Sequence, residues 1–128
     1  MSEIPRDLRY TTSHEWVKQE DNGSYTMGIT DHAQSEMGEI VMVELPGLDS
    51  EYDKGDAMGS LEAVKTAEDF MAPMDLEVAG VNDDLEDTPD LVNQEPYGGG
   101  WLVKYTASDP SQYNDLMTPE EYANYIGE

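Results

Sequence analysis

Short extended segments separated by turn residues dominate the sequence. The most strand-like run, residues 40–45, is rich in apolar and β-branched side chains and ends at Pro46-Gly47. Asn22-Gly23 precedes another extended run, residues 25–30, and this dipeptide is a strong hairpin signal. The spacing leaves no room for the long crossover helices of a parallel sheet, so we expect an antiparallel sandwich or partly open barrel. Further strands are expected at residues 57–63, 67–71, 76–81 and 101–105.

A helix is predicted at the C-terminal end, over about residues 119–126. Thr118 lies three residues before Glu121, which is the spacing of a capping box. Pro119 would occupy the first helical position, where its missing N–H costs nothing. Gly127 can end the helix.

Two further short helical segments are expected at the margins of the sheet. Asp31 with Gln34 is expected to cap a helix that ends at Gly38, and Asp109-Pro110 opens a shorter turn. The acidic run 83–87 lacks the spacing and the central glycine of an EF-hand. We therefore expect this run to be a solvated loop.

Charge and composition narrow the classes of function. The chain has 29 acidic and 6 basic residues in 128, a formal net charge of −23. This balance argues against binding to nucleic acids or anionic membranes, which need clustered cations. Yet 8 Tyr, 2 Trp and 8 Met are too many large apolar side chains for a disordered acidic coil, and the length suits one domain over residues 1–128.

The sequence shows no sign of secretion, membrane insertion or thiol chemistry. The first residues lack the profile of a secretory or transit peptide, and no apolar stretch approaches the roughly 18 residues that span a bilayer. The chain has no cysteine, which rules out a disulfide or a thiol nucleophile. A cytoplasmic location is expected.

Lys65 is the one cation between Lys54 and Lys104. It falls between the expected strands 57–63 and 67–71, near the tip of a hairpin, where other proteins can reach its side chain. A catalytic amine must be held uncharged by burial or by neighbouring cations, but acidic residues surround this lysine. Lys65 is therefore a poor catalytic amine and a reasonable target for enzymatic acylation, unless it is an ordinary surface lysine.

Several segments match one known family in order and spacing. They include Ser13-His14-Glu15-Trp16, the run 28–34 and Glu62-Ala63-Val64-Lys65. With residues 38–41, 81–82, 91–97 and 100–101, they make the chain resemble the glycine cleavage system H-protein family from about residue 8 to residue 125. The resemblance implies a mainly β, single-domain barrel-sandwich hybrid (hammerhead) of lipoyl/biotinyl type, with short flanking helices and a lipoyl hairpin at about 57–72.

The resemblance also implies a cofactor and the residues around it. Lys65 would carry lipoate in amide linkage, with Glu62 and Val64 recognised during lipoylation. Biotinyl domains place Met on both sides of their lysine, and lipoyl domains of 2-oxoacid dehydrogenases more often have Asp before it, whereas here Val64 and Thr66 flank it. A lipoyl or biotinyl carrier for another complex and an unmodified acidic interaction module remain the alternatives.

In this family the protein is a carrier and not an enzyme. Glycine decarboxylase loads an aminomethyl group onto the lipoyl arm, aminomethyltransferase passes the one-carbon unit to tetrahydrofolate, and dihydrolipoamide dehydrogenase reoxidises the dithiol. The resemblance therefore implies these three partners and a lipoate-attaching enzyme, for a chain expected to be a monomer. It also implies a cleft for the loaded arm, formed by Ser13, Glu15 and Asp69. No metal site is expected, because His14 and His32 lack metal-binding spacing.

Two positions depart from the family pattern. Asp75-Leu76 stands where the family usually has Ser-Gly, and Ala63 replaces a frequent Ser. Leucine does not readily adopt the positive φ that glycine allows, so the turn before residue 76 must take another shape. Because the family glycine is associated with recognition by the lipoylating enzyme, the change bears on the efficiency of lipoylation.

Overall fold

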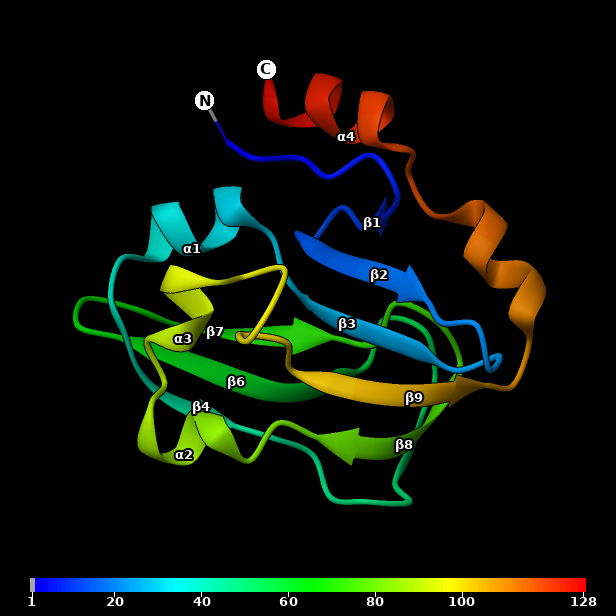
Figure 1. Ribbon diagram of the computed structural model, residues 1–128, viewed down its shortest axis with the longest axis horizontal. Coiled ribbons are helices and arrows are strands. Elements are labelled where there is room, and N and C mark those ends of the chain that lie inside the picture. Colours follow the sequence, from blue (N-terminus) through cyan, green and yellow to red (C-terminus); the bar gives the residue numbers. More distant parts are fainter. Residues whose placement is uncertain (1) are drawn as a thin grey trace.

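Two antiparallel β-sheets form the centre of the computed structural model, which describes residues 2–128 (Figure 1). The six-stranded sheet has the order β1-β2-β3-β9-β8-β5, and the three-stranded sheet has the order β4-β6-β7. The mainly β fold is confirmed. The strands are β1 (Arg9–Tyr10), β2 (Glu15–Gln19), β3 (Tyr25–Ile29), β4 (Ile40–Glu44), β5 (Glu51–Tyr52), β6 (Ala57–Ala63), β7 (Ala67–Met71), β8 (Leu76–Val81) and β9 (Val103–Ala107).

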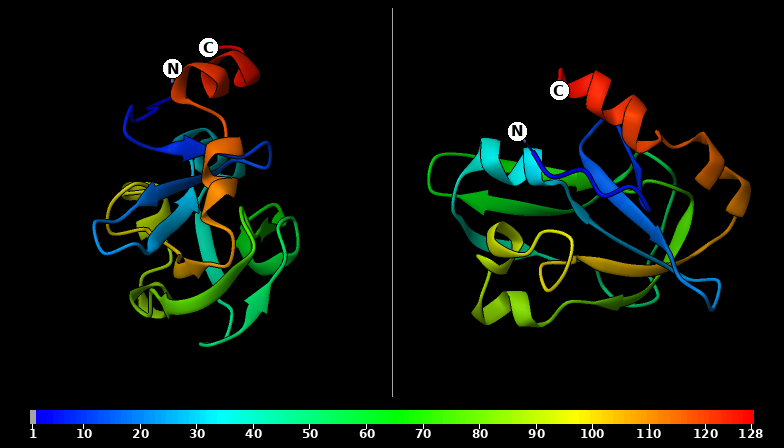
Figure 2. Two further views of the ribbon diagram at one scale, coloured as in Figure 1. Left: turned by 90° about the vertical axis from the view of Figure 1, so that its right-hand side faces the viewer. Right: turned by 45° about the horizontal axis from the view of Figure 1, so that its top comes forward.

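Short helices lie at the margins of the two sheets (Figure 2). None of the helices found in residues 2–128 has the length and hydropathy of a membrane-spanning segment. The helices are α1 (Asp31–Met37), α2 (Asp84–Asp87), α3 (Leu91–Gln94), the 3-10 helix η1 (Pro110–Asp115) and α4 (Pro119–Ile126).

The N-terminus of α1 corrects the expected capping residue. Thr30, not Asp31, is the N-cap, because its backbone is still extended at the end of β3 and its Oγ1 accepts the Ala33 N–H (3.2 Å). Asp31 is the first helical residue and accepts a hydrogen bond from Gln34 Nε2 (2.7 Å). The predicted pair thus forms inside the first turn.

The acidic run 83–87 is also different from the expectation. It forms α2 instead of a solvated loop, because Leu85 is only 1% exposed and packs into the main core. The acidic side chains around Leu85 remain exposed. One buried leucine therefore anchors this acidic helical turn to the sheets.

The strand expected at 101–105 is shifted along the chain. β9 begins at Val103, because Trp101 still belongs to the preceding turn, where its N–H donates to the Gly98 carbonyl (3.1 Å). Leu102 then donates to the Met27 carbonyl (2.8 Å) beside the start of the strand. The glycine-rich turn thus extends two residues further than expected.

The α4 helix packs on the N-terminal part of the chain (Figure 2). Both hydrogen bonds of its capping box are present: the Glu121 N–H donates to Thr118 Oγ1 (3.2 Å), and the Thr118 N–H donates to Glu121 Oε1 (2.8 Å). Gly127 ends the helix in a left-handed conformation. The Tyr122 ring is fully buried and stacks on Tyr10, with ring centroids 4.7 Å apart. At the end of the chain, the Ser2 N–H donates to Glu128 Oε1 (2.7 Å).

A separate small core under α4 holds the start of β2. It consists of Leu8, Tyr10, Trp16 and Tyr122, while the larger core fills the space between the sheets. Trp16 Nε1 donates to the Pro96 carbonyl (2.8 Å), and its indole lies so close to Gly28 that a Cβ there would be 2.8 Å from Nε1. Only glycine leaves room for the indole at this position.

In the part of the chain that the structure describes, no residue of the turn before β8 has a positive φ. Leu76 is 1% exposed and begins the strand as a core residue. Asp75 forms the turn, and its Oδ1 accepts the Lys54 N–H (2.7 Å). The turn thus takes a shape in which the family glycine is not needed.

Candidate functional site

Lys65 lies in the connection between β6 and β7. The Ala63 N–H donates to the Thr66 carbonyl (2.7 Å), so the chain reverses direction over Val64 and Lys65. Both side chains are exposed, and Val64 is 71% exposed. Figure 1 shows this hairpin extending from one end of the molecule. The amine of Lys65 is therefore accessible to large partners.

Glu62 precedes this connection on β6. It pairs with Ala67 of β7 and with Met42 of β4, so its backbone is held from both sides. Its side chain is half-buried, in contrast to Val64 and Lys65. The residues predicted for recognition during lipoylation thus comprise one ordered strand residue and one exposed apolar side chain.

A cavity of about 210 Å³ lies between the start of β2, α1 and β7. Ser13, Glu15 and Asp69, the residues predicted to form a cleft, all line it. They come from two segments more than 50 residues apart, and the fold brings them together. The remaining lining residues are His14, Ile29, His32, Ala33, Glu36, Met37, Leu61, Glu68 and Phe70.

Glu15 is the most buried carboxylate of this cavity, at 1% exposure. Its Oε1 accepts the hydroxyls of Thr11 and Ser13, and its Oε2 accepts the Met71 N–H (3.1 Å). Burial raises the pKa of Glu15, although these hydrogen bonds oppose the shift. No Lys, Arg or His ion pair within residues 2–128 involves Glu15. A cation entering the cavity would meet a desolvated carboxylate with no cationic partner.

Two histidines also meet at the cavity, although their spacing in the sequence gave no sign of it. The His14 and His32 rings lie with centroids 5.1 Å apart. His14 has a φ of 70°, in the left-handed region that non-glycine residues rarely occupy. Across residues 2–128, no group of three or more His, Cys, Asp or Glu residues is arranged to hold a metal ion. The one signal in the sequence that could have pointed to His14 was the match of the Ser13-His14-Glu15-Trp16 segment to a known family.

A second cavity, of about 360 Å³, lies on another side of Glu15. Ser13 and Glu15 line both cavities, so these two residues form a shared wall. The second cavity is larger, but its other lining residues come from the segment 10–12, from Lys54-Gly55, from the end of β7 and the two residues after it, and from the segment 115–117. The smaller cavity contains Asp69 and other residues of the β6–β7 hairpin, and it is the better candidate for a group attached to Lys65.

A mainly β scaffold that presents an exposed lysine in a hairpin connection, with strand β7 of that hairpin lining a cavity rich in carboxylates, is an arrangement typical of carrier domains. Comparison with known proteins identifies the kind of carrier. The model of the family "Glycine cleavage H-protein" matches residues 8–128. The chain therefore belongs to the glycine cleavage H-protein family.

Individual relatives agree with this assignment over their whole length. The chain is 48% identical to a glycine cleavage system H protein of Pseudoalteromonas atlantica, over 100% of this chain and 99% of that protein. It is 47% identical to one of Vibrio vulnificus, over 98% and 99%. The crystal structure of a glycine cleavage system H protein from Mycobacterium marinum superposes with a TM-score of 0.89 at 33% identity, covering 98% of this chain and 100% of that one.

The family assignment confirms three predictions made from the sequence. These are the resemblance itself, the barrel-sandwich fold class and the role of a carrier in the glycine cleavage system. As a member of this family, the chain is a carrier subunit and not an enzyme. The family is one that carries lipoate.

Proposed function

We propose that Lys65 is the attachment site of the lipoyl group and that the 210 Å³ cavity receives the loaded arm. The observation that supports this most is the position of Lys65, exposed in the hairpin connection whose strand β7 also lines the cavity. Attached lipoate would supply a disulfide that is reduced by two electrons when it takes up a one-carbon amine group, and the dithiol left after the group departs would be reoxidised.

The cavity suits a cationic amine. Glu15 is desolvated and has hydrogen bonds but, among residues 2–128, no cationic partner, and Asp69 adds a second carboxylate. A carboxylate and an ammonium group form a charge-assisted hydrogen bond, which is stronger away from water. Ser13 holds the Glu15 carboxylate in place through its hydroxyl (2.6 Å). The cavity would therefore hold the amine and keep water from it.

Glu62 and Val64 would be read by the lipoate-attaching enzyme. Val64 is 71% exposed beside Lys65, which makes it available to a binding surface, and Glu62 is held by strands on both sides. The absence of cysteine from the chain means that no protein thiol could exchange with the arm. Lipoate thus fits the residues present.

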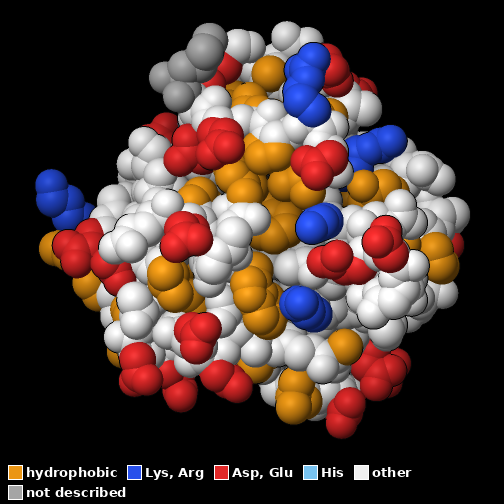
Figure 3. All heavy atoms as spheres, viewed as in Figure 1, with side chains coloured by type: hydrophobic (Ala, Val, Ile, Leu, Met, Phe, Trp, Pro, Cys, Tyr) orange, Lys and Arg blue, Asp and Glu red, His pale blue; other side chains and the backbone are white. Residues whose placement is uncertain are grey.

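The partners would be glycine decarboxylase, aminomethyltransferase and dihydrolipoamide dehydrogenase, each meeting the same attached group in turn. Tethering raises the effective concentration of the group at each partner without new contacts. Acidic side chains are spread over the face in Figure 3, which suits fast, salt-sensitive encounters with basic docking surfaces. We expect the chain, residues 1–128, to act as one domain and as a monomer, in the cytoplasm. Sedimentation would test whether the chain is a monomer, and cell fractionation would test its location.

Intact mass tests the attachment. The chain is incubated with lipoate, ATP and a lipoate-attaching enzyme, and the product is digested to locate the added mass. We expect one lipoyl increment on Lys65, its loss in Lys65→Arg, and its retention in Lys54→Arg, a matched change at another exposed lysine. An unmodified parent chain, under conditions that lipoylate another H protein, would contradict the proposal. A biotinyl increment in cells would favour a different carrier.

A further inference from the structure

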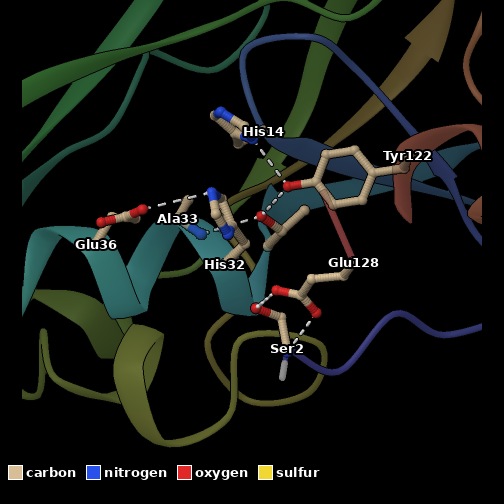
Figure 4. Close-up of polar contacts among 8 residues, drawn as sticks. Ser2, His14, His32, Ala33, Glu36, Tyr122 and Glu128 are labelled. Carbon is tan, nitrogen blue, oxygen red and sulfur yellow. Dashed lines mark hydrogen bonds and ion pairs between the residues drawn. The ribbon is translucent and has the colours of Figure 1, made fainter. Parts of the chain in front are cut away.

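A chain of hydrogen bonds connects α4 to the cavity through two buried hydroxyl groups (Figure 4). Thr30 Oγ1 lies 2.7 Å from Tyr122 Oη, and Tyr122 Oη lies 2.9 Å from His14 Nδ1. Thr30 Oγ1 also accepts the Ala33 N–H (3.2 Å) as the cap of α1. Thr30 and Tyr122 both have 0% exposure, so water does not supply alternative partners.

The positions of the protons in this chain of hydrogen bonds, called the relay below, follow from counting donors and acceptors. Among the described residues, Tyr122 Oη is the one recorded acceptor for the Thr30 hydroxyl proton. If Tyr122 donated to Thr30 instead, the buried Thr30 proton would have no partner. Thr30 therefore donates to Tyr122, and Tyr122 donates to His14 Nδ1. An Nδ1 atom that accepts a hydrogen bond carries no proton, so the proton of a neutral His14 is on Nε2.

The surroundings of His14 agree with a neutral ring. Burial lowers the pKa of His14, and the neighbouring His32 lowers it further. Glu36 on α1 and Glu68 on β7 act in the opposite direction, and Tyr125 on α4 contributes an aromatic contact at 5.9 Å. Burial also raises the pKa of Tyr122 to about 12, so this hydroxyl keeps the proton that it donates.

We propose that Thr30 and Tyr122 are positioning residues that hold His14 uncharged, with its proton on Nε2, at the wall of the cavity. Figure 4 shows the second ring nitrogen of His14 pointing away from Tyr122. An imidazolium at this wall would repel a cationic amine, whereas a neutral imidazole leaves the carboxylates of Glu15 and Asp69 unopposed. The relay thus tunes the cavity for a cation. This consequence rests on the proposed function, but the state of His14 does not.

The state of His14 can be read directly from the imidazole ¹⁵N resonances of the labelled, unlipoylated chain. Long-range ¹H–¹⁵N correlations distinguish a protonated from an unprotonated ring nitrogen, and His32→Gln assigns the two histidines. At pH 7.5 we expect His14 with Nε2 protonated and Nδ1 bare. In Tyr122→Phe the proton should distribute over both nitrogens. The titration midpoint should rise by roughly half to one pH unit, because the neutral form loses a hydrogen bond.

Tyr125→Phe is the matched control. It removes a hydroxyl from the same helix and from a ring that also faces His14, but this hydroxyl donates to the Thr12 carbonyl (3.1 Å). Tyr125→Phe should leave the tautomer and the midpoint of His14 unchanged. Thr30→Ser, which keeps the hydroxyl that donates to Tyr122, should preserve the tautomer. A parent chain with Nδ1 protonated would overturn the proposal without any variant, and so would equal changes in the two tyrosine variants.

The effect on the bound amine is measured separately, in the lipoylated and loaded chain. We expect a shorter lifetime of the amine group in Tyr122→Phe than in Tyr125→Phe, with a difference that grows as the pH falls through the His14 midpoint. Equal lifetimes at all pH values would overturn the link between His14 and the cation. If intact mass showed no lipoyl group on Lys65, the proposed function would be rejected. The ¹⁵N spectra of the unlipoylated chain would still decide the protonation state of His14.

Discussion

Asp75 and Gln112 bind each other through two hydrogen bonds. The Asp75 N–H donates to Gln112 Oε1 (2.7 Å), and Gln112 Nε2 donates to Asp75 Oδ2 (3.1 Å). Because Asp75 Oδ1 also accepts the Lys54 N–H, one carboxylate ties together three segments of the chain. These bonds stabilise the turn that replaces the family's Ser-Gly.

Removal of this carboxylate should destabilise the fold. We expect Asp75→Ala to lower the free energy of unfolding by about 1–3 kcal/mol, because it removes two acceptors and leaves the Lys54 N–H without its partner. Urea unfolding measures the change. Asp53→Ala is the control, since within residues 2–128 the Asp53 side chain makes no recorded hydrogen bond. Equal loss in both variants would contradict the role of Asp75.

Gly28 should not tolerate a methyl group. Gly28→Ala would place a Cβ 2.8–2.9 Å from the Trp16 indole, so the indole must move, and we expect a loss of about 1–3 kcal/mol. Near-ultraviolet circular dichroism of the tryptophans and urea unfolding report the change. In Gly80→Ala, the Cβ would meet only the Lys104 Cβ at 3.8 Å, an ordinary contact. An unaffected Gly28→Ala would show that the indole is not held tightly.

Glu15 should make stability depend on pH in a defined direction. Because burial raises its pKa, the native state holds the Glu15 proton more tightly than the unfolded chain does. This contribution is complete below the unfolded value, about 4.3, and is lost as the pH rises through the higher folded value. The free energy of unfolding of the parent relative to Glu15→Gln should therefore decrease as the pH rises from about 4 into the neutral range.

The matched control for this pH dependence is Glu77→Gln, an exposed strand residue. A change shared by both variants reflects the loss of one negative charge, and the predicted decrease is the part seen only with Glu15→Gln. Urea unfolding at a series of pH values gives both curves. A parent that gains stability relative to Glu15→Gln with rising pH would reverse the predicted sign.

Added salt should stabilise the fold. The chain has a net charge of −23, and its described ion pairs are three contacts of 3.4–4.0 Å between mostly exposed groups. Repulsion among the acidic residues therefore outweighs the ion pairs, and screening reduces it. Between 10 mM and 500 mM KCl we expect a gain of about 1 kcal/mol or more, equivalent to roughly 3–6 °C in Tm.

Calorimetry checks this prediction. Tetramethylammonium chloride at the same ionic strength should have a similar effect, because screening does not depend on specific binding of the cation. A Tm that is constant or falls in both salts would show that repulsion does not limit stability.

Local patterns in the sequence located much of the scaffold. Residues 57–63, 67–71 and 76–81 have the bounds of β6, β7 and β8, because each run is short and ends at turn residues. Leu85 shows the limit of this reasoning. Its acidic neighbours suggested a loop, and only the tertiary core explains why one leucine holds α2 in place.

The cavity was harder to predict than the scaffold. Ser13, Glu15 and Asp69 were found through resemblance to a family, not through a local pattern. The Thr30–Tyr122 hydrogen bond joins residues 92 positions apart, and no periodicity encodes such a contact. The left-handed φ of His14 was not predicted either, because histidine adopts this conformation more often than most residues but still only rarely.

The contact between Ser2 and Glu128 places the two ends of the described chain side by side, next to α4 (Figure 1). The β6–β7 hairpin extends from a different part of the molecule. A short peptide linker could therefore close the backbone into a ring, and new termini could be opened in the exposed Asn22-Gly23 turn. Such a circular permutant would keep both sheets and the presented lysine, so the order in which the segments are connected is separable from the geometry that presents the lysine.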